Sequence, residues 1–281
     1  MSRDTESTFS ELVKETLSLL NTRFSSLLKV ACWIAAPLLV LHLVLGAVFG
    51  LPFIQGQGTE QTWTQVFLNE QEGNAFSSVQ TPFIGLDLLL LLSYPLLWGA
   101  GLYYLIWREN EPVSEKQALR HALASYFRMI SSWIAYIFYM TIIGIGIVVA
   151  ILLFSLSGIL IIEIIGIAAA VILTLYISAR ICLFFGFSVI DGNFAGISRS
   201  WKFTRGFGWW ITAYLVVFFV TMSLVDRTAA AVLQTTLGSS VLQMIIQYLV
   251  YVLTSLVALT AYAVLFKEMK RRNFSKLGVD L

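Results

Sequence analysis

Residues 196–210, GISRSWKFTRGFGWW, combine cations with aromatic rings between two long apolar runs. Three basic side chains, Arg199, Lys202 and Arg205, stand among five Trp and Phe residues. Guanidinium and ammonium groups bind phosphate and carboxylate oxygens, and aromatic rings of Trp favour the boundary between membrane and water. The stretch therefore predicts a site for an anion. A nucleic acid, an anionic ligand and the headgroups of a membrane are the three alternatives for its source.

A second set of polar side chains lies inside apolar runs, where such groups are costly and often functional. Asp87, Glu163 and Gln247 stand 21, 17 and 20 residues before the Lys or Arg that closes their runs, which is about 25 to 31 Å along a helix. We therefore expect all three near the outer boundary of a membrane. They either form a polar ring that lines a vestibule or binds a lipid headgroup, or they are simply solvated at the interface.

Arg180 closes one of these runs and is expected to act as an anchor whose stem lies along apolar surface while its head reaches the interface. We count it with Arg199, Lys202 and Arg205 as a candidate contact to lipid headgroups.

Motifs for catalysis or cofactor binding are missing from the sequence. It contains no GxxxxGK phosphate loop, no HExxH and no GxSxG. Its two histidines, His42 and His121, do not stand in a metal-ligand cluster, and Cys32 and Cys182 do not form a CxxC pair. We therefore expect no enzymatic activity, no cofactor and no metal.

The composition is that of an integral membrane protein. Hydrophobic residues make up 58% of the 281 residues and charged residues 12%, whereas soluble domains are about one half apolar and one quarter charged. Mean hydropathy is +0.82. A helix needs about 20 apolar residues to span the hydrocarbon. Six runs are candidates for such helices: 27–50, 83–107, 130–155, 159–180, 209–225 and 241–266.

The distribution of cations predicts the orientation of these spans. Seventeen of the eighteen Lys and Arg residues lie in the N-terminal segment, in 108–128, in 180–208 or in the tail 267–281. Arg227 is the exception. Cytoplasmic segments of membrane proteins carry the excess of Lys and Arg. Both termini are therefore predicted to be cytoplasmic, with the protein in the cell membrane.

An amphipathic stretch precedes every second span. Segments 9–28 and 115–130 place apolar residues on one helical face, and 196–210 is their third counterpart. The predicted unit is a cytoplasmic amphipathic helix, a span, an outer loop and a second span. The alternative is that these stretches are convergent linkers. Three units, at about 9–107, 113–187 and 194–269, make one all-α membrane domain of six transmembrane helices over 1–281, with outer loops at 51–82 and 226–240.

This pattern resembles the membrane domain of glycerophosphoryl diester phosphodiesterases and the related YciC-like six-span bacterial membrane proteins. The resemblance is carried by Arg180 at the end of the fourth span, SVIDG at 188–192, ISRSWKFTRGFGWW, and TAYAVLFKEMKRRN near the C-terminus. FGF at 185–187 departs from it, because a turn containing proline is expected there. The resemblance implies a six-helix membrane module without the catalytic domain.

Three functions follow as hypotheses. The first is a non-enzymatic module that binds membrane lipids or a partner membrane protein, or forms a homo-oligomer, in envelope homeostasis. The second is a small-molecule transporter or channel subunit, whose sites usually lie near the midplane. The third is a lipid-modifying enzyme, for which no convergent catalytic groups are found. Nucleic acid is not expected as a partner, because a lone basic stretch between two spans is typical of a juxtamembrane helix.

Overall fold

The computed structural model of the chain describes residues 8–48, 84–107, 113–155, 160–190, 196–238 and 240–277. Regular structure in these ranges is entirely helical, which confirms the predicted all-α class. Five helical stretches within them are long and apolar enough to cross a membrane. The helices are α1 (Phe9–Val48), α3 (Ile84–Trp107), α4 (Glu115–Ser155), α5 (Leu160–Ile181), α6 (Phe184–Ile190), α7 (Ile197–Phe203), α8 (Gly208–Leu237) and α9 (Val241–Leu277).

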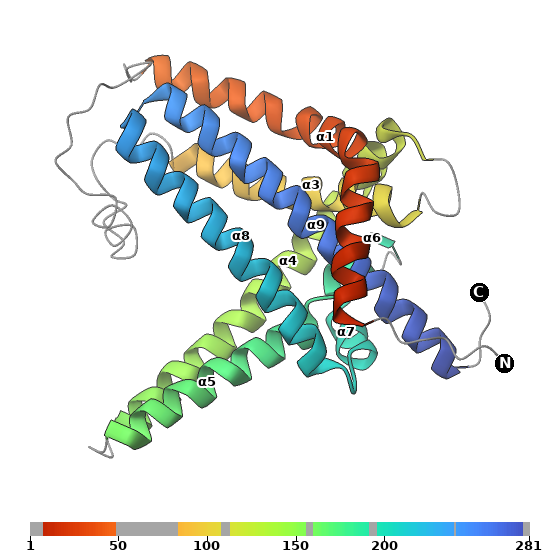
Figure 1. Cartoon of the computed structure of the whole chain (residues 1–281), viewed down its shortest axis with the longest axis vertical. Coiled ribbons are helices and arrows are strands. Elements are labelled where there is room, and N and C mark those ends of the chain that lie inside the picture. The colour runs from red at the N-terminus through yellow and green to blue at the C-terminus, as the bar shows by residue number, and fades with distance from the viewer. Residues whose placement is uncertain are drawn as a thin grey trace.

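Helix α9 lies between α1 and α8 and also packs on α3 (Figure 1). Its second half carries much of the core, with Leu259 and Phe266 at most 1% exposed. Tyr214 of α8 connects its helix to both α1 and α9. Its hydroxyl lies 2.9 Å from Oγ1 of Thr16 on α1 and donates to the carbonyl of Ala261 on α9 at 3.2 Å. The first half of α1 is therefore part of the packed core.

The apolar helices do not form one parallel bundle. Helices α4 and α5 make a hairpin that diverges from α1, α8 and α9 (Figure 1). Side chains in the second half of α4, such as Phe138, Ile145 and Leu153, are largely exposed. Lipid tails are as apolar as Leu side chains, so a helix that is apolar all round has no hydrophobic drive to close onto its neighbours. The predicted six-helix bundle is thus replaced by a central group and a projecting hairpin.

Two of the predicted amphipathic segments, 9–28 and 115–130, are the first halves of long continuous helices. Both helices begin with the same capping arrangement. The backbone N–H of Thr8 donates to Oε2 of Glu11 at 2.6 Å, and that of Ser114 donates to Oε1 of Gln117 at 2.8 Å. The third segment, 196–210, contains the seven-residue helix α7, a turn in which Gly206 has φ +89°, and the first residues of α8.

The predicted outer loop 226–240 is wrong over most of its length, because α8 continues to Leu237. Asp226, the first residue of this predicted loop, lies within α8. Its carboxylate instead accepts a hydrogen bond from Oγ1 of Thr254 on α9, at 3.0 and 3.2 Å to its two oxygens. A polar side chain that is paired across a helix interface does not have to end a helix.

The tail predicted at 267–281 is also not a separate segment, since α9 is helical to Leu277. Within it, Glu268 forms a buried ion pair with Nε of Arg272 at 2.7 Å. The guanidinium of Arg272 lies 4.8 Å from the centroid of the Trp210 ring on α8. The predicted outer loop 51–82 lies outside the described residues.

Candidate functional site

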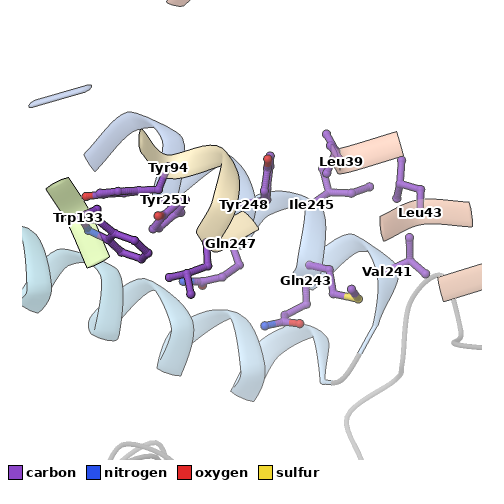
Figure 2. A pocket seen from close by; sticks show the side chains of 12 residues that line it. Leu39, Leu43, Tyr94, Trp133, Val241, Gln243, Ile245, Gln247, Tyr248 and Tyr251 are labelled. Atoms are coloured by element: carbon purple, nitrogen blue, oxygen red, sulfur yellow. The ribbon is translucent and has the colours of Figure 1, made fainter. Parts of the chain in front are cut away.

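A cavity of about 620 Å³ lies between α1, α3 and α9, with one residue of α4 at its end (Figure 2). We call it the Gln247 cavity. Its walls are mainly apolar and aromatic, with two amide side chains on α9. No Lys or Arg belongs to the twelve described residues that line it, which are Leu39, Leu43, Leu91, Tyr94, Trp133, Val241, Gln243, Met244, Ile245, Gln247, Tyr248 and Tyr251.

Helical spacing on α9 positions the polar groups of this cavity. Gln243, Gln247 and Tyr251 are four residues apart, so they lie on one face of the helix. The hydroxyl of Tyr248 donates to the backbone carbonyl of Ala35 on α1 at 3.1 Å, which fixes this part of α9 against α1. This contact joins two of the helices that bound the cavity.

Oε1 of Gln247 is buried and accepts no hydrogen bond from any residue that the structure describes. Leaving a buried acceptor unpaired costs about 1–3 kcal/mol. The side chain belongs to the cavity lining, where Figure 2 shows it between the aromatic residues and Gln243. This arrangement suits a bound molecule that carries a hydrogen-bond donor.

Aromatic rings gather at one end of the cavity, where Tyr94, Trp133 and Tyr251 lie together (Figure 2). The ring centroids of Tyr94 and Tyr251 are 6.4 Å apart. Thr254, one helical turn further along α9, donates to the carboxylate of Asp226. The negative charge of Asp226 therefore stands about one turn from this aromatic end.

A second cavity of about 440 Å³ lies where α3, α4, α5, α6, α8 and α9 meet, and we call it the Tyr262 cavity. Tyr94 and Trp133 line both cavities. Tyr262 uses its hydroxyl within the protein, since it donates to the carbonyl of Cys182 at 2.9 Å and accepts from the N–H of Gly186 at 3.0 Å. The remaining lining is mostly apolar, with Leu175, Val216 and Phe219 facing the space between α5 and α8.

Arg180 does not extend toward lipid, which corrects its predicted role as an anchor at the interface. It is 7% exposed. Its Nε donates to Oγ1 of Thr204 at 2.8 Å, and its Nη2 donates to the carbonyl of Trp201 at 2.6 Å. The guanidinium carbon also lies 4.3 Å from the centroid of the Trp201 ring. Arg180 therefore ties the end of α5 to α7 and the turn after it.

The three cations of 196–210 are all exposed, Arg199 and Lys202 on α7 and Arg205 in the following turn. Trp201 and Trp209, on either side of that turn, are also exposed. Ser200 and Thr204, in the same segment, are 0% exposed. The surface thus presents cations and indole rings together, and its contact with lipid headgroups stays a prediction.

The three residues of the predicted outer ring belong to three different helices. Gln247 lines a cavity, whereas the side chains of Asp87 on α3 and Glu163 on α5 lie outside the described part of the structure. Glu163 is the fourth residue of α5. Figure 1 places the start of α5 at the tip of the hairpin, away from the starts of α3 and α9. The start of α5 is therefore apart from the starts of the other two helices, and a ring of the three side chains stays a prediction.

Sequence reasoning found Gln247 from its depth in an apolar run, but it missed Tyr94, Trp133 and Asp226. Tyr94 stands beside Pro95, and Trp133 stands in a long apolar helix, and neither has a spacing that marks a cavity. Only the crossing of α3, α4 and α9 brings them together. Within the ranges that the structure covers, no three His, Cys, Asp or Glu side chains are placed to hold a metal ion.

Comparison with known proteins finds no family model, no curated protein and no solved structure that matches the chain.

Proposed function

We propose that the chain is a six-span, non-enzymatic protein of the cytoplasmic membrane, and that it binds a membrane lipid in the Gln247 cavity. Five helical stretches long and apolar enough to cross a membrane support the membrane class. Helix α3 is the proposed sixth span, because its 24 residues extend about 36 Å along the helix axis. A hydrocarbon core of about 30 Å is shorter than that.

The cation distribution supports an orientation with both termini in the cytoplasm. Seventeen of eighteen Lys and Arg residues fall on the side assigned to the cytoplasm. In this orientation the turn between α8 and α9 faces outward, and the Gln247 cavity, which begins at Val241, lies in the outer half of the membrane. Arg199, Lys202 and Arg205 then face the anionic inner leaflet, where each contributes about 1 kcal/mol to surface attachment.

The threefold repeat and the family resemblance are also part of this proposal. The shared capping arrangement at Thr8–Glu11 and Ser114–Gln117 supports a common plan for the first two units. The third unit is the most divergent, since α7 has seven residues and is separated from α8 by a turn. We propose kinship with the membrane domain of glycerophosphoryl diester phosphodiesterases and the YciC-like proteins on these grounds.

One observation carries the lipid-binding proposal: a buried amide oxygen, with no hydrogen-bond partner among the described residues, in a cavity with apolar and aromatic walls. Binding pockets typically combine such walls with a few polar groups that orient the ligand. A membrane lipid or another amphiphile has both an apolar part that fits the walls and a polar part that can donate to the amide oxygen. It is present at high concentration around any membrane protein and can enter from the side.

Native mass spectrometry of the protein released from nanodiscs tests this proposal. We expect wild-type protein to retain lipid, and we expect Met244→Trp, which fills the cavity, to retain several-fold less. Leu249→Trp is the matched control, because Leu249 lies on the same helix but is 50% exposed and outside the cavity. Equal retention by both variants, or no retained lipid in wild type, would contradict lipid binding at this site.

A transporter is the second candidate, and one observation favours it. The two cavities follow one another along α9, with Tyr94 and Trp133 between them. Reconstituted liposomes test it. A transport role requires substrate-dependent flux that Asp87→Asn or Glu163→Gln abolishes, and absence of flux across a broad panel of solutes would contradict it.

The exposed α4–α5 hairpin is the surface that we propose for a partner membrane protein or a second copy.

A further inference from the structure

The two cavities are adjacent compartments along α9. The Gln247 cavity follows α9 from Val241 to Tyr251, and the other compartment includes Tyr262. Eleven residues separate Tyr251 from Tyr262, which is about 16 Å along the helix. Tyr94 and Trp133 line both compartments, so these two side chains lie between them.

The compartments differ in polarity. The Gln247 cavity contains two amide side chains, Gln243 and Gln247, and the unpaired Oε1 of Gln247. In the Tyr262 cavity the lining consists mostly of aliphatic and aromatic side chains, and the hydroxyl of Tyr262 already has two partners within the protein. A molecule with one polar end and one apolar end matches this order of compartments.

The polar compartment selects the charge of its ligand. Oε1 of Gln247 accepts hydrogen bonds and cannot donate them. Faces of Tyr and Trp rings attract cations, and Tyr94, Trp133 and Tyr251 line this cavity. No Lys or Arg belongs to the described lining of this cavity. The acceptor and the rings together favour a cation that can also donate a hydrogen bond, which is a primary ammonium group.

We infer that both compartments hold one amphiphile, with a primary ammonium headgroup at Gln247 and an apolar chain that passes Tyr94 and Trp133 into the Tyr262 cavity. This inference rests on the proposed lipid binding and adds the headgroup chemistry and the path of the chain. In the proposed orientation the headgroup lies in the outer half of the membrane and the chain points inward, as in an outer-leaflet lipid.

Headgroup selection is tested with full-length protein in nanodiscs that contain equal amounts of phosphatidylethanolamine, phosphatidylcholine and phosphatidylglycerol with identical chains. Phosphatidylethanolamine carries a primary ammonium, phosphatidylcholine carries a cation that cannot donate a hydrogen bond from nitrogen, and phosphatidylglycerol donates from hydroxyls without a cation. We expect native mass spectra to show retained phosphatidylethanolamine in roughly ten-fold excess over phosphatidylcholine. A single-chain form of the same lipid is distinguished by its mass.

Variants at Gln247 extend this test. Gln247→Leu removes the acceptor and is expected to reduce the excess to about equal retention, whereas Gln247→Glu keeps an acceptor and is expected to preserve it. Equal retention of the three lipids by wild type would overturn the inference about the headgroup, and so would a preference for phosphatidylglycerol. Neither result would overturn lipid binding itself, which fails only when no lipid is retained or when filling the cavity changes nothing.

The chain path is tested with adjacent residues of α8. Val216 lines the Tyr262 cavity, whereas Val217 is 47% exposed and does not line it. Val216→Trp shortens the space for the chain, so retention of phosphatidylethanolamine with 18-carbon chains is expected to fall several-fold relative to 12-carbon chains. Val217→Trp is expected to leave this ratio as in wild type. An unchanged ratio in Val216→Trp would overturn the chain path.

Discussion

Thr254 on α9 donates a hydrogen bond from Oγ1 to the carboxylate of Asp226 on α8, with 3.0 and 3.2 Å to its two oxygens. Thr254 is buried, and the pair lies inside two apolar helices. The contact therefore couples α8 to α9 next to the aromatic end of the Gln247 cavity, and it explains how an acidic residue is accommodated within a long apolar helix.

Thr254→Val removes the hydroxyl but keeps the shape of the side chain. We expect it to lower the free energy of unfolding in detergent by about 1 kcal/mol, since hydrogen bonds between membrane helices contribute about 0.6 to 2 kcal/mol. Thermal unfolding measures the change. Thr254→Ser keeps the donor and serves as the control. If Asp226→Asn destabilised the Thr254→Val protein as much as wild type, the two residues would not be coupled and this interpretation would be wrong.

Arg180→Lys is expected to destabilise the protein by about 2 kcal/mol, although the charge is unchanged. A lysine ammonium cannot bond Thr204 and the Trp201 carbonyl together in the planar geometry of a guanidinium. Limited proteolysis at residues 196–207 should also become faster, because this segment loses its link to α5. Lys202→Arg, at an exposed position, is the control. Equal thermal stability of Arg180→Lys and wild type would contradict the structural role of Arg180.

Gly101 marks a close approach of α3 to α9. A Cβ atom there would collide with the side chain of Leu259, which is 1% exposed. Gly101→Val is expected to lower stability by about 1–3 kcal/mol, as overpacking usually does. Gly144 on α4 has nothing within 4 Å of an added Cβ, so Gly144→Val supplies the matched substitution without a clash. Thermal unfolding that ranks the two variants equally would argue against the packing of α3 on α9.

The proposed orientation predicts which residues a membrane-impermeant maleimide can reach in intact cells. With Cys32 and Cys182 replaced by alanine, Thr59→Cys in the predicted outer loop should be labelled from outside. Ser114→Cys and Arg205→Cys should react only after the membrane is permeabilised. Labelling of Ser114→Cys from outside would contradict the predicted orientation of α4.

The sequence predicted helix boundaries well where an apolar run is flanked by polar or turn-forming residues on both sides. The runs 83–107 and 159–180 differ by one residue at the start from α3 and α5, and by at most one at the end. The border at Asp226 was wrong, because a hydrogen bond from Thr254 on α9 makes the carboxylate tolerable within α8. No pattern in one sequence shows a partner that lies on another helix.

The candidate site was only partly predictable for the same reason. Gln247 stood out as an amide inside an apolar run, but Tyr94 and Trp133 acquire their role from helix crossings. Arg180 was placed correctly at the end of α5 and interpreted wrongly, since its acceptors at Trp201 and Thr204 lie beyond a turn. Divergence of the α4–α5 hairpin depends on tertiary packing, which the apolar pattern alone does not specify.

Photocrosslinking tests the central claim, lipid binding in the Gln247 cavity, most directly. Nanodiscs are prepared with phosphatidylethanolamine that carries a diazirine near its headgroup, and the crosslinked residues are mapped by mass spectrometry. We expect crosslinks on α3 at 91–94 and on α9 at 243–251, and we expect them to be lost in Met244→Trp. Crosslinks confined to the exposed faces of α4 and α5, with none in the cavity, would contradict it.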